Sequence, residues 1–213
     1  MTENSETKVE REQRAESSTS RKPWDKQCYL EKEKVPTVKE IIDKAEDIVD
    51  NRTRCLFILT YLTAGRMQEL VRYTHKKENR SSIKSSDIEI EDIENRKILL
   101  INLRNEKNRD KHRKDIPIPL DIDENKKLFN MIVPYLNSIQ KDAELFPFTY
   151  KRAYAILNKI NPDWNPHYLR HIRLTHLVTV YGYREYQLTM YAGWSDPRPA
   201  KHYLQMRWQD LLY

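Results

Sequence analysis

The pattern of hydrophobic and polar positions changes period twice along the 213-residue chain, which predicts helices on both sides of a small sheet. Apolar residues recur at helical spacing from Val38 to Val49, after a Thr37 and Glu40 pair that is typical of a capping box. A nearly continuous apolar run predicts a second, buried helix over 52–64, and a further short helix is expected to begin near Arg66.

The middle of the chain alternates with period two, which indicates strands. Ile88 and Ile90 alternate with acidic residues, and an apolar strand over 98–103 follows a polar turn at 94–97. The segment 116–120 contains two prolines, which restrict it to the edge of a sheet. We therefore expect a small antiparallel sheet of three strands.

Helical spacing returns in the last part of the chain. Helices are expected over 123–140, 149–160, 166–180, 184–192 and 197–210. Pro134 is expected to kink the first of these helices, and Gly182 and Gly193 are placed to cap the third and the fourth. The predicted fold class is mainly α with a small antiparallel β-sheet, an α+β fold.

The distribution of apolar residues divides the chain into a tail, a linker and one domain. Residues 1–22 contain almost no apolar side chains and are expected to be disordered. Residues 23–36 are predicted to be a linker, and 37–213 a single domain with a C-terminal tail from about residue 205. The longest nearly apolar run, 55–65, is shorter than the roughly 20 residues that span a bilayer, so no membrane partner is expected.

Composition removes several functional classes. Only three residues are glycine, so neither a Gly-rich phosphate loop nor a dinucleotide fingerprint can form. A kinase, a nucleotide-driven motor or a Rossmann dehydrogenase is therefore not expected, and no cofactor is predicted. The two cysteines, Cys28 and Cys55, form no disulfide framework or metal set, which favours a reducing compartment such as the cytoplasm.

The net charge is compatible with a nucleic-acid partner but does not by itself indicate one. The chain has 38 basic and 32 acidic residues, a formal net charge of +6. Residues 1–35 contain eight of each sign, so the whole excess lies after them. An evenly solvated basic surface would give the same sum as a surface that binds nucleic acid.

Three short stretches could carry chemistry, although each has an ordinary structural explanation. His167 and Arg170 share one helix face and could hold a phosphate, or they could be a surface arginine beside a satisfied histidine. His167 and His171 have the spacing of zinc ligands, but no glutamate of the metalloprotease motif and no third ligand lies nearby, so no metal is expected. Arg66 and Glu69 could form a functional pair or a simple salt bridge at a helix start.

The segment 104–114 lies between two predicted strands and contains six basic and two acidic residues. A hairpin of this kind can place basic side chains at DNA phosphates, although a solvated loop would have the same composition. The candidate DNA contacts are Arg104, Arg109, Arg113 and Lys114. Tyrosine is no guide by itself, since nine of the 13 tyrosines fall within 148–213.

Taken together, these stretches resemble the catalytic domain of the tyrosine recombinases, the family of phage integrases and Xer-type recombinases. Three motifs carry the resemblance, in the family's order: an Arg followed three residues later by an acid and Leu, a His-x-x-Arg-His that opens a helix before a Thr-His pair, and a Gly-(His or Trp)-Ser with a Tyr nine residues beyond. They correspond here to Arg66–Leu70, His167–His171 with Thr175 and His176, and Gly193–Ser195 with Tyr203. The resemblance covers about residues 37–204.

The resemblance implies a role for each matching residue. Arg66 and Arg170 would clamp the non-bridging oxygens of a scissile phosphate, and Tyr203 would attack phosphorus to give a 3′-phosphotyrosyl link. His167 would act in proton transfer or hydrogen bonding near the nucleophile, and Trp194 would pack and donate its indole N–H. The supporting residue Glu69 would orient Arg66 or another group of the site.

The resemblance also implies a lysine, from the basic hairpin, that protonates the leaving 5′-oxygen. Lys107 lies nearest the end of the first strand and is the first choice, while Lys111 has the better spacing to Ile118–Leu120. The loop is longer than is usual for the family and has no glycine, so both lysines stay open. Gly65 and Gly193 stand immediately before motif residues and are expected to mark bends of the backbone at the site.

The implied function is that of a site-specific DNA recombinase or integrase, with duplex DNA as the partner and a tetramer on paired sites. Only about 36 residues precede the predicted domain, which leaves two alternatives: the chain is a truncated or stand-alone catalytic domain, or a separate core-binding domain or protein supplies the DNA clamp. Two alternatives remain: an enzyme similar to type IB topoisomerases, or a non-catalytic DNA-binding or regulatory module. The expected location is cytoplasmic and nucleoid-associated, for a protein of viral or mobile-element origin.

Overall fold

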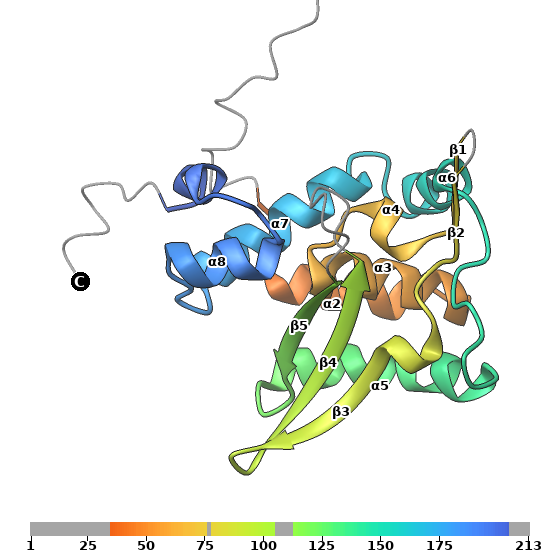
Figure 1. Ribbon diagram of the computed structural model, residues 1–213, viewed down its shortest axis with the longest axis horizontal. Helices are drawn as coiled ribbons and strands as arrows, with labels where there is room; N and C mark the ends of the chain where they lie inside the picture. Colours follow the sequence, from red (N-terminus) through yellow and green to blue (C-terminus); the bar gives the residue numbers. More distant parts are fainter. Residues whose placement is uncertain (1–34, 76–77, 105–112, 205–213) are drawn as a thin grey trace, which may run out of the picture. The chain divides into compact units, whose positions relative to one another are not determined.

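The computed structural model describes residues 35–75, 78–104 and 113–204, and Figure 1 shows their arrangement. The helices before the sheet are α2 (Val38–Asp47), α3 (Asn51–Thr63) and α4 (Met67–Leu70). The strands are β1 (Tyr73–His75), β2 (Glu78–Arg80), β3 (Ile88–Ile93), β4 (Arg96–Arg104) and β5 (Arg113–Pro119), with a 3-10 helix η3 (Ser85–Asp87) before β3. The later helices are α5 (Asp123–Ser138), α6 (Tyr150–Ile160), α7 (Pro166–Thr179) and α8 (Glu185–Ala192), followed by the 3-10 helix η4 (Arg198–His202).

Helix α2 begins where its sequence predicts. The Thr37 backbone N–H donates to Glu40 Oε2 at 2.7 Å, and the Glu40 N–H donates to Thr37 Oγ1 at 3.2 Å, which is the predicted capping box. Helix α3 starts with Asp50, whose carboxylate accepts the Thr53 N–H at 2.8 Å. From Cys55 to Thr63 every side chain of α3 is buried, so this helix forms the centre of the core.

The three strands β3, β4 and β5 form the predicted antiparallel sheet in that order. Ile101 of β4 pairs with Ile88 on one side and Ile116 on the other. Strand β5 lies at an edge and carries Pro117 and Pro119, which lack an N–H group; since they are two residues apart, both missing donors face away from β4. The edge position is therefore confirmed. Strand β5 also contacts α5, which runs behind the sheet in Figure 1.

Two elements differ from the prediction. The hairpin of β1 and β2 was not expected, because its strands are three residues long and polar, with no apolar alternation to reveal them. Of the helix predicted over 197–210, the described part is a 3-10 helix of five residues, Arg198–His202, and residues 205–210 lie outside the described residues. Pro197 and Pro199 favour this short element, since neither can donate a backbone hydrogen bond.

The other predicted helices are confirmed within one or two residues, and α5 continues through Pro134. Val180, in a right-handed conformation, caps α7, whereas Gly182 follows two residues later with φ +69°. The predicted disordered tail 1–22, nearly all of the linker 23–36 and the tail from 205 lie outside the described residues. None of the described helices combines the length and the apolar character needed to cross a membrane.

Candidate active site

The site begins at the corner between α3 and α4. Ala64 ends α3 in the left-handed region with φ 43°, and Gly65 and Arg66 follow before α4. A Cβ on Gly65 would lie 2.8 Å from Thr63 Oγ1 and 3.2 Å from Leu103 Cδ1. The bend predicted at Gly65 is thus made by Ala64, and glycine follows it because a larger side chain has no room there.

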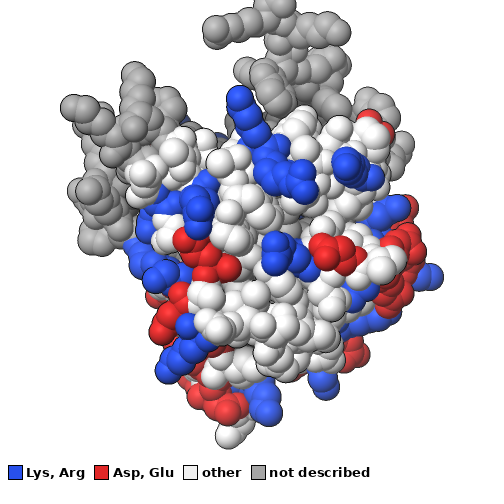
Figure 2. Space-filling view, turned by 90° about the vertical axis from the view of Figure 1, so that its right-hand side faces the viewer, with Lys and Arg blue, Asp and Glu red and all other residues white. Residues whose placement is uncertain are grey.

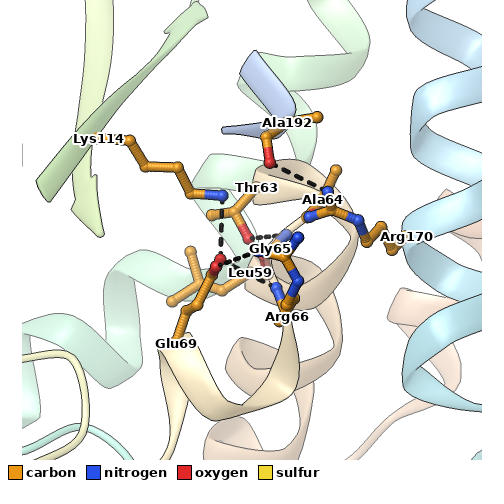
Figure 3. Close-up of polar contacts among 9 residues, drawn as sticks. All are labelled: Leu59, Thr63, Ala64, Gly65, Arg66, Glu69, Lys114, Arg170 and Ala192. Carbon is orange, nitrogen blue, oxygen red and sulfur yellow. Dashed lines mark hydrogen bonds and ion pairs between the residues drawn. The ribbon is translucent and has the colours of Figure 1, made fainter. Parts of the chain in front are cut away.

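Glu69 on α4 is the centre of a buried ionic cluster, shown in Figure 3. Its Oε1 accepts from Arg66 Nη1 at 3.0 Å, and its Oε2 accepts from the Arg66 backbone N–H at 3.0 Å. Lys114 Nζ lies 3.0 Å from the same Oε2. Burial works to raise the pKa of Glu69, but Lys114, Arg66 and Arg170 outweigh burial and keep this pKa below its ordinary value, so the carboxylate is ionised.

Lys114 reaches this cluster from strand β5. On β5 the buried positions alternate as Lys114, Ile116 and Ile118, so the lysine belongs to the core face of the strand, opposite Leu103. Its side chain is 7% exposed. Lys114 was expected among the surface contacts to DNA and instead lies inside the cluster; the period-two pattern of β5 is the signal that could have placed it there.

The surroundings of Lys114 change its acidity. Burial lowers the pKa of Lys114 to about 8, with Glu69 opposing this shift and Arg170 and Arg66 adding to it. An amine with a pKa near neutrality can lose a proton to a reacting group and regain it from solvent. Lys114 is therefore a candidate proton donor as well as a positive charge.

Arg170 stands near the start of α7, where Pro166 occupies the first turn and Asn165 Oδ1 accepts the Tyr168 N–H at 3.0 Å. The Arg170 guanidinium donates through Nη1 to the Ala64 carbonyl and through Nη2 to the Ala192 carbonyl, the latter at 3.0 Å (Figure 3). These carbonyls end α3 and α8. Burial and the neighbouring Arg66 lower the pKa of Arg170 to about 10, which leaves it charged at neutral pH.

His167 lies one turn before Arg170 on the same helix and is exposed at the surface of the domain. The partial burial of its ring lowers the pKa of His167, and the positive charges of Arg170 and Arg66 lower it further. At neutral pH the imidazole is therefore neutral, and a neutral imidazole can accept a proton.

Tyr203 follows η4 and packs between two rings of the motif residues. Its ring centroid is 5.9 Å from that of Trp194, nearly parallel to it, and 5.3 Å from that of His171. The Trp194 ring lies 5.8 Å from Arg170 Cζ, and Gly193, with φ 67°, caps α8 directly before it. Tyr203 therefore lies next to Arg170. The sequence had placed His171 in a motif and considered it as a zinc ligand, but it gave the residue no catalytic role, and its contact with Tyr203 was not foreseen.

The other residues predicted from the basic segment 104–114 are described only in part. The predicted DNA contact Arg109 and the two candidate proton donors, Lys107 and Lys111, lie outside the described residues. Arg104 and Arg113 face each other across the ends of β4 and β5, and the Arg113 guanidinium donates to Asp87 and Asn102. Together with Glu69 they line a polar cavity of about 290 Å³.

The charges of the described site do not cancel. Arg66, Lys114 and Arg170 contribute three positive charges, and Glu69 contributes the one negative charge among the residues with which they make these contacts. Two positive charges are left for an anion. Within the described residues no group of three His, Cys, Asp or Glu side chains is arranged to bind a metal ion. On the face seen in Figure 2, Lys and Arg side chains gather in the upper part, above most of the acidic ones.

No protein-family model matches the chain, and no curated protein matches it in sequence. Solved structures match it in shape. The pre-cleavage complex of the XerH site-specific recombinase bound to difH has a TM-score of 0.56 at 15% identity, covering 82% of this chain and 50% of that one. XerA recombinase has a TM-score of 0.55 at 18% identity, covering 82% and 60%.

The XerH post-cleavage complex with palindromic difH is similar to the same degree, with a TM-score of 0.56 at 15% identity. The chain has the tyrosine recombinase fold. That fold comprises the mainly helical architecture with a small antiparallel sheet, and so confirms the fold class predicted from the sequence. The chain spans 50–60% of the length of these recombinases, and at such low identity the likeness concerns the fold alone.

Proposed function

We propose that this protein breaks and rejoins DNA as a site-specific recombinase, with Tyr203 as the nucleophile. The observation that carries the proposal is the convergence of Arg66, Lys114 and Arg170 around one buried carboxylate, beside the Tyr203 ring. A phosphodiester is an anion, and more negative charge develops on its oxygens as a nucleophile attacks phosphorus. Fixed positive charges in a buried site stabilise that developing charge without reorganising.

The reaction exchanges one ester for another. Tyr203 Oη forms a bond to phosphorus while the bond from phosphorus to the 5′-oxygen breaks, which leaves a 3′-phosphotyrosyl link and a 5′-hydroxyl. The phenol proton passes to the neutral His167, and a lysine supplies the proton that the leaving oxygen takes up. Attack by a 5′-hydroxyl of a second strand reverses these steps and rejoins the DNA. Because the number of phosphoester bonds is unchanged, no nucleotide cofactor is required.

Lys114 becomes the first choice for that proton donor, ahead of Lys107 and Lys111. Its burial, its lowered pKa and its contact with Glu69 support this choice. Glu69 then has the role of a positioning residue, since one carboxylate holds both Arg66 and Lys114. Trp194 supports the nucleophile by packing against its ring.

We propose duplex DNA as the partner, with four protomers on paired sites. The formal net charge of +6 and the basic part of the surface in Figure 2 support an anionic partner. Because the chain spans about half the length of the XerH recombinase, we propose that a core-binding domain or a separate protein completes the clamp around DNA.

A trapping experiment tests the function directly. Because the target site is unknown, the substrate is a pool of nicked duplexes with randomised sequence, from which a cleaved end diffuses away. The wild-type protein should form a covalent adduct with DNA, and Tyr203→Phe should form none. Tyr186→Phe is the matched control, because this tyrosine is 74% exposed on α8 and should leave the adduct unchanged.

Other outcomes would point elsewhere. If the wild-type protein binds duplex DNA but gives no adduct, it is a non-catalytic DNA-binding module. If it gives a Tyr203 adduct and relaxes supercoiled DNA without exchanging strands between duplexes, the protein is an enzyme similar to type IB topoisomerases and not a recombinase.

A further inference from the structure

Arg173 is a second buried arginine on α7, and its positive charge is not balanced by a neighbouring carboxylate among the described residues. It is 2% exposed, and the polar groups around its guanidinium are the hydroxyls of Tyr61, Tyr181 and Tyr191 and the Asn125 amide. Its Nη2 lies 3.5 Å from Asn125 Oδ1. Burying a cation in this way costs free energy that an apolar side chain would not cost, so the charge calls for an explanation.

Tyrosine rings enclose the Arg173 guanidinium. Its Cζ lies 5.1 Å from the ring centroid of Tyr61 and 5.1 Å from that of Tyr181. Burial works to lower the pKa of Arg173, but Tyr191, Tyr61 and Tyr181 raise it above the ordinary value, so the guanidinium is charged. The cation therefore attracts side chains from α3, from α8 and from the segment after α7.

The same helices hold the phosphate-binding candidate Arg170, one turn earlier on α7. Tyr61 stands on α3 three residues before Ala64, and Tyr191 stands on α8 directly before Ala192; Ala64 and Ala192 supply the two carbonyls that orient the Arg170 guanidinium. The Tyr191 hydroxyl also donates to the Leu62 carbonyl, which joins α8 to α3. A guanidinium held at two points presents its other N–H groups in a fixed plane.

We propose that Arg173 is a positioning residue for Arg170. By drawing Tyr61 and Tyr191 onto α7, it fixes the ends of α3 and α8, and with them the two carbonyl oxygens that set the plane of the Arg170 guanidinium. The consequence for the reaction rests on the proposed function, whereas the consequence for phosphate binding does not. A displacement of about 1 Å at such a group is enough to slow a reaction by about 100-fold.

The variants are chosen to separate positioning from stability. Arg173→Met keeps the length of the side chain and removes the charge, and Tyr191→Phe removes only the hydroxyl that joins α8 to α3. Ile41→Ala is the matched control, since Ile41 is fully buried on α2, a helix that supplies no residue of the site. Thermal unfolding shows which temperature leaves all variants folded, and every assay is run there.

The decisive readout is cleavage of a phosphodiester compared with a methylphosphonate, whose phosphorus centre lacks one negatively charged oxygen. Arg170→Ala should slow cleavage of the phosphodiester at least 10-fold more than cleavage of the methylphosphonate. Arg173→Met and Tyr191→Phe should likewise lose more rate on the phosphodiester than on the methylphosphonate. Ile41→Ala should slow both substrates equally. An equal loss on both substrates in Arg173→Met, or no loss, would overturn the inference.

Binding of inorganic phosphate tests the inference even if no DNA is cleaved. If the wild-type protein cleaves neither substrate, the proposed function fails, and titration calorimetry with inorganic phosphate decides the role of Arg173. Arg170→Ala and Arg173→Met should both weaken phosphate binding at least several-fold, and Ile41→Ala should not. Unchanged affinity in Arg173→Met, or wild-type binding that does not depend on Arg170, would overturn the inference.

Discussion

At the scale of single residues, the protonation states of Glu69 and Lys114 depend on each other. Burial alone would favour the neutral form of both side chains. The carboxylate stays ionised because Lys114, Arg66 and Arg170 are close to it, and the lysine keeps a pKa of about 8 because Glu69 opposes the effects of burial and of the two arginines. The lysine is therefore protonated at neutral pH and close to losing its proton, as a general acid requires.

If Lys114 is replaced, the proposed proton donor is lost, and a leaving group that needs no proton should restore the rate of cleavage. Lys114→Ala should slow cleavage of normal DNA by about 100-fold to 10,000-fold, and a 5′-thiolated leaving group should restore the rate because a thiolate leaves without a proton. With normal DNA the wild-type rate should fall as pH rises through about 8, where Lys114 loses its proton, and this decline should be absent with the thiolated DNA. Lys107→Ala and Lys111→Ala are the controls. Sulfur rescue of either one, but not of Lys114→Ala, would return the role to the hairpin loop.

At the scale of elements, the site is assembled from the ends of helices. The last carbonyl groups of a helix have no partner within the helix and carry partial negative charge. The carbonyls of Ala64 and Ala192, at the ends of α3 and α8, are of this kind, and both accept from Arg170. Arg66 lies immediately before α4 and is placed by the left-handed residue Ala64. Short connections between helices thus determine where the charges point.

Two glycine substitutions should show which loss of stability is confined to the local backbone and which also slows cleavage at the site. Gly65→Ala should lower stability by about 1–3 kcal/mol, because the new Cβ would lie 2.8 Å from Thr63 Oγ1, and it should also slow cleavage by moving Arg66. Gly182→Ala should cost about 1–2 kcal/mol through its φ of +69° alone, since nothing lies within 4 Å of the new Cβ. Urea unfolding and the rate of adduct formation measure the two effects. Equal losses of cleavage in the two variants would contradict this account of the corner.

At the scale of the whole domain, His176 ties its first residues to the core. The Tyr61 hydroxyl donates to His176 Nδ1 at 2.8 Å, and His176 Nε2 donates to the Pro36 carbonyl at 2.7 Å. This arrangement uses both nitrogens of the neutral imidazole. Burial lowers the pKa of His176 to about 4, although the contact with Pro36 opposes the shift and Arg173 adds to it. Burial and His167 likewise lower the pKa of His171 to about 4.

Stability should therefore decline when the solution becomes mildly acidic. Between pH of about 6.5 and about 4 the unfolded chain binds protons at these histidines and the native chain does not, so the free energy of unfolding falls with pH, by up to about 3 kcal/mol for each histidine. Urea unfolding across this range should show a smaller decline for His176→Gln. His202→Gln, at an exposed position, should follow the wild-type curve. A decline in His176→Gln as steep as that of the wild type would contradict this prediction.

Much of the fold follows from local patterns. The apolar spacing from Val38, the buried run of α3 and the alternation around β4 each belong to one segment, and the structure confirms them. The capping pair Thr37 and Glu40 is likewise local. The β1 and β2 hairpin could not be predicted, because two polar strands of three residues carry no apolar pattern. In the described part of the helix expected from residue 197, the chain forms a short 3-10 helix instead, because two nearby prolines limit its backbone hydrogen bonds.

The sequence by itself determined the order of the elements and the three motifs that contain the candidate arginines, histidine and tyrosine, since these depend on spacings of a few residues. Only the tertiary structure placed Lys114 beside the carboxylate that also holds Arg66. The contact between Glu69 and Lys114 depends on the register of β5, and Arg170 is oriented by carbonyls 106 and 22 residues away. The tyrosines beside Arg173 likewise come from α3 and from the segment after α7. The alternation of β5 could place Lys114 on the core face of its strand, but the partners that these side chains meet depend on packing between elements, which no local pattern encodes.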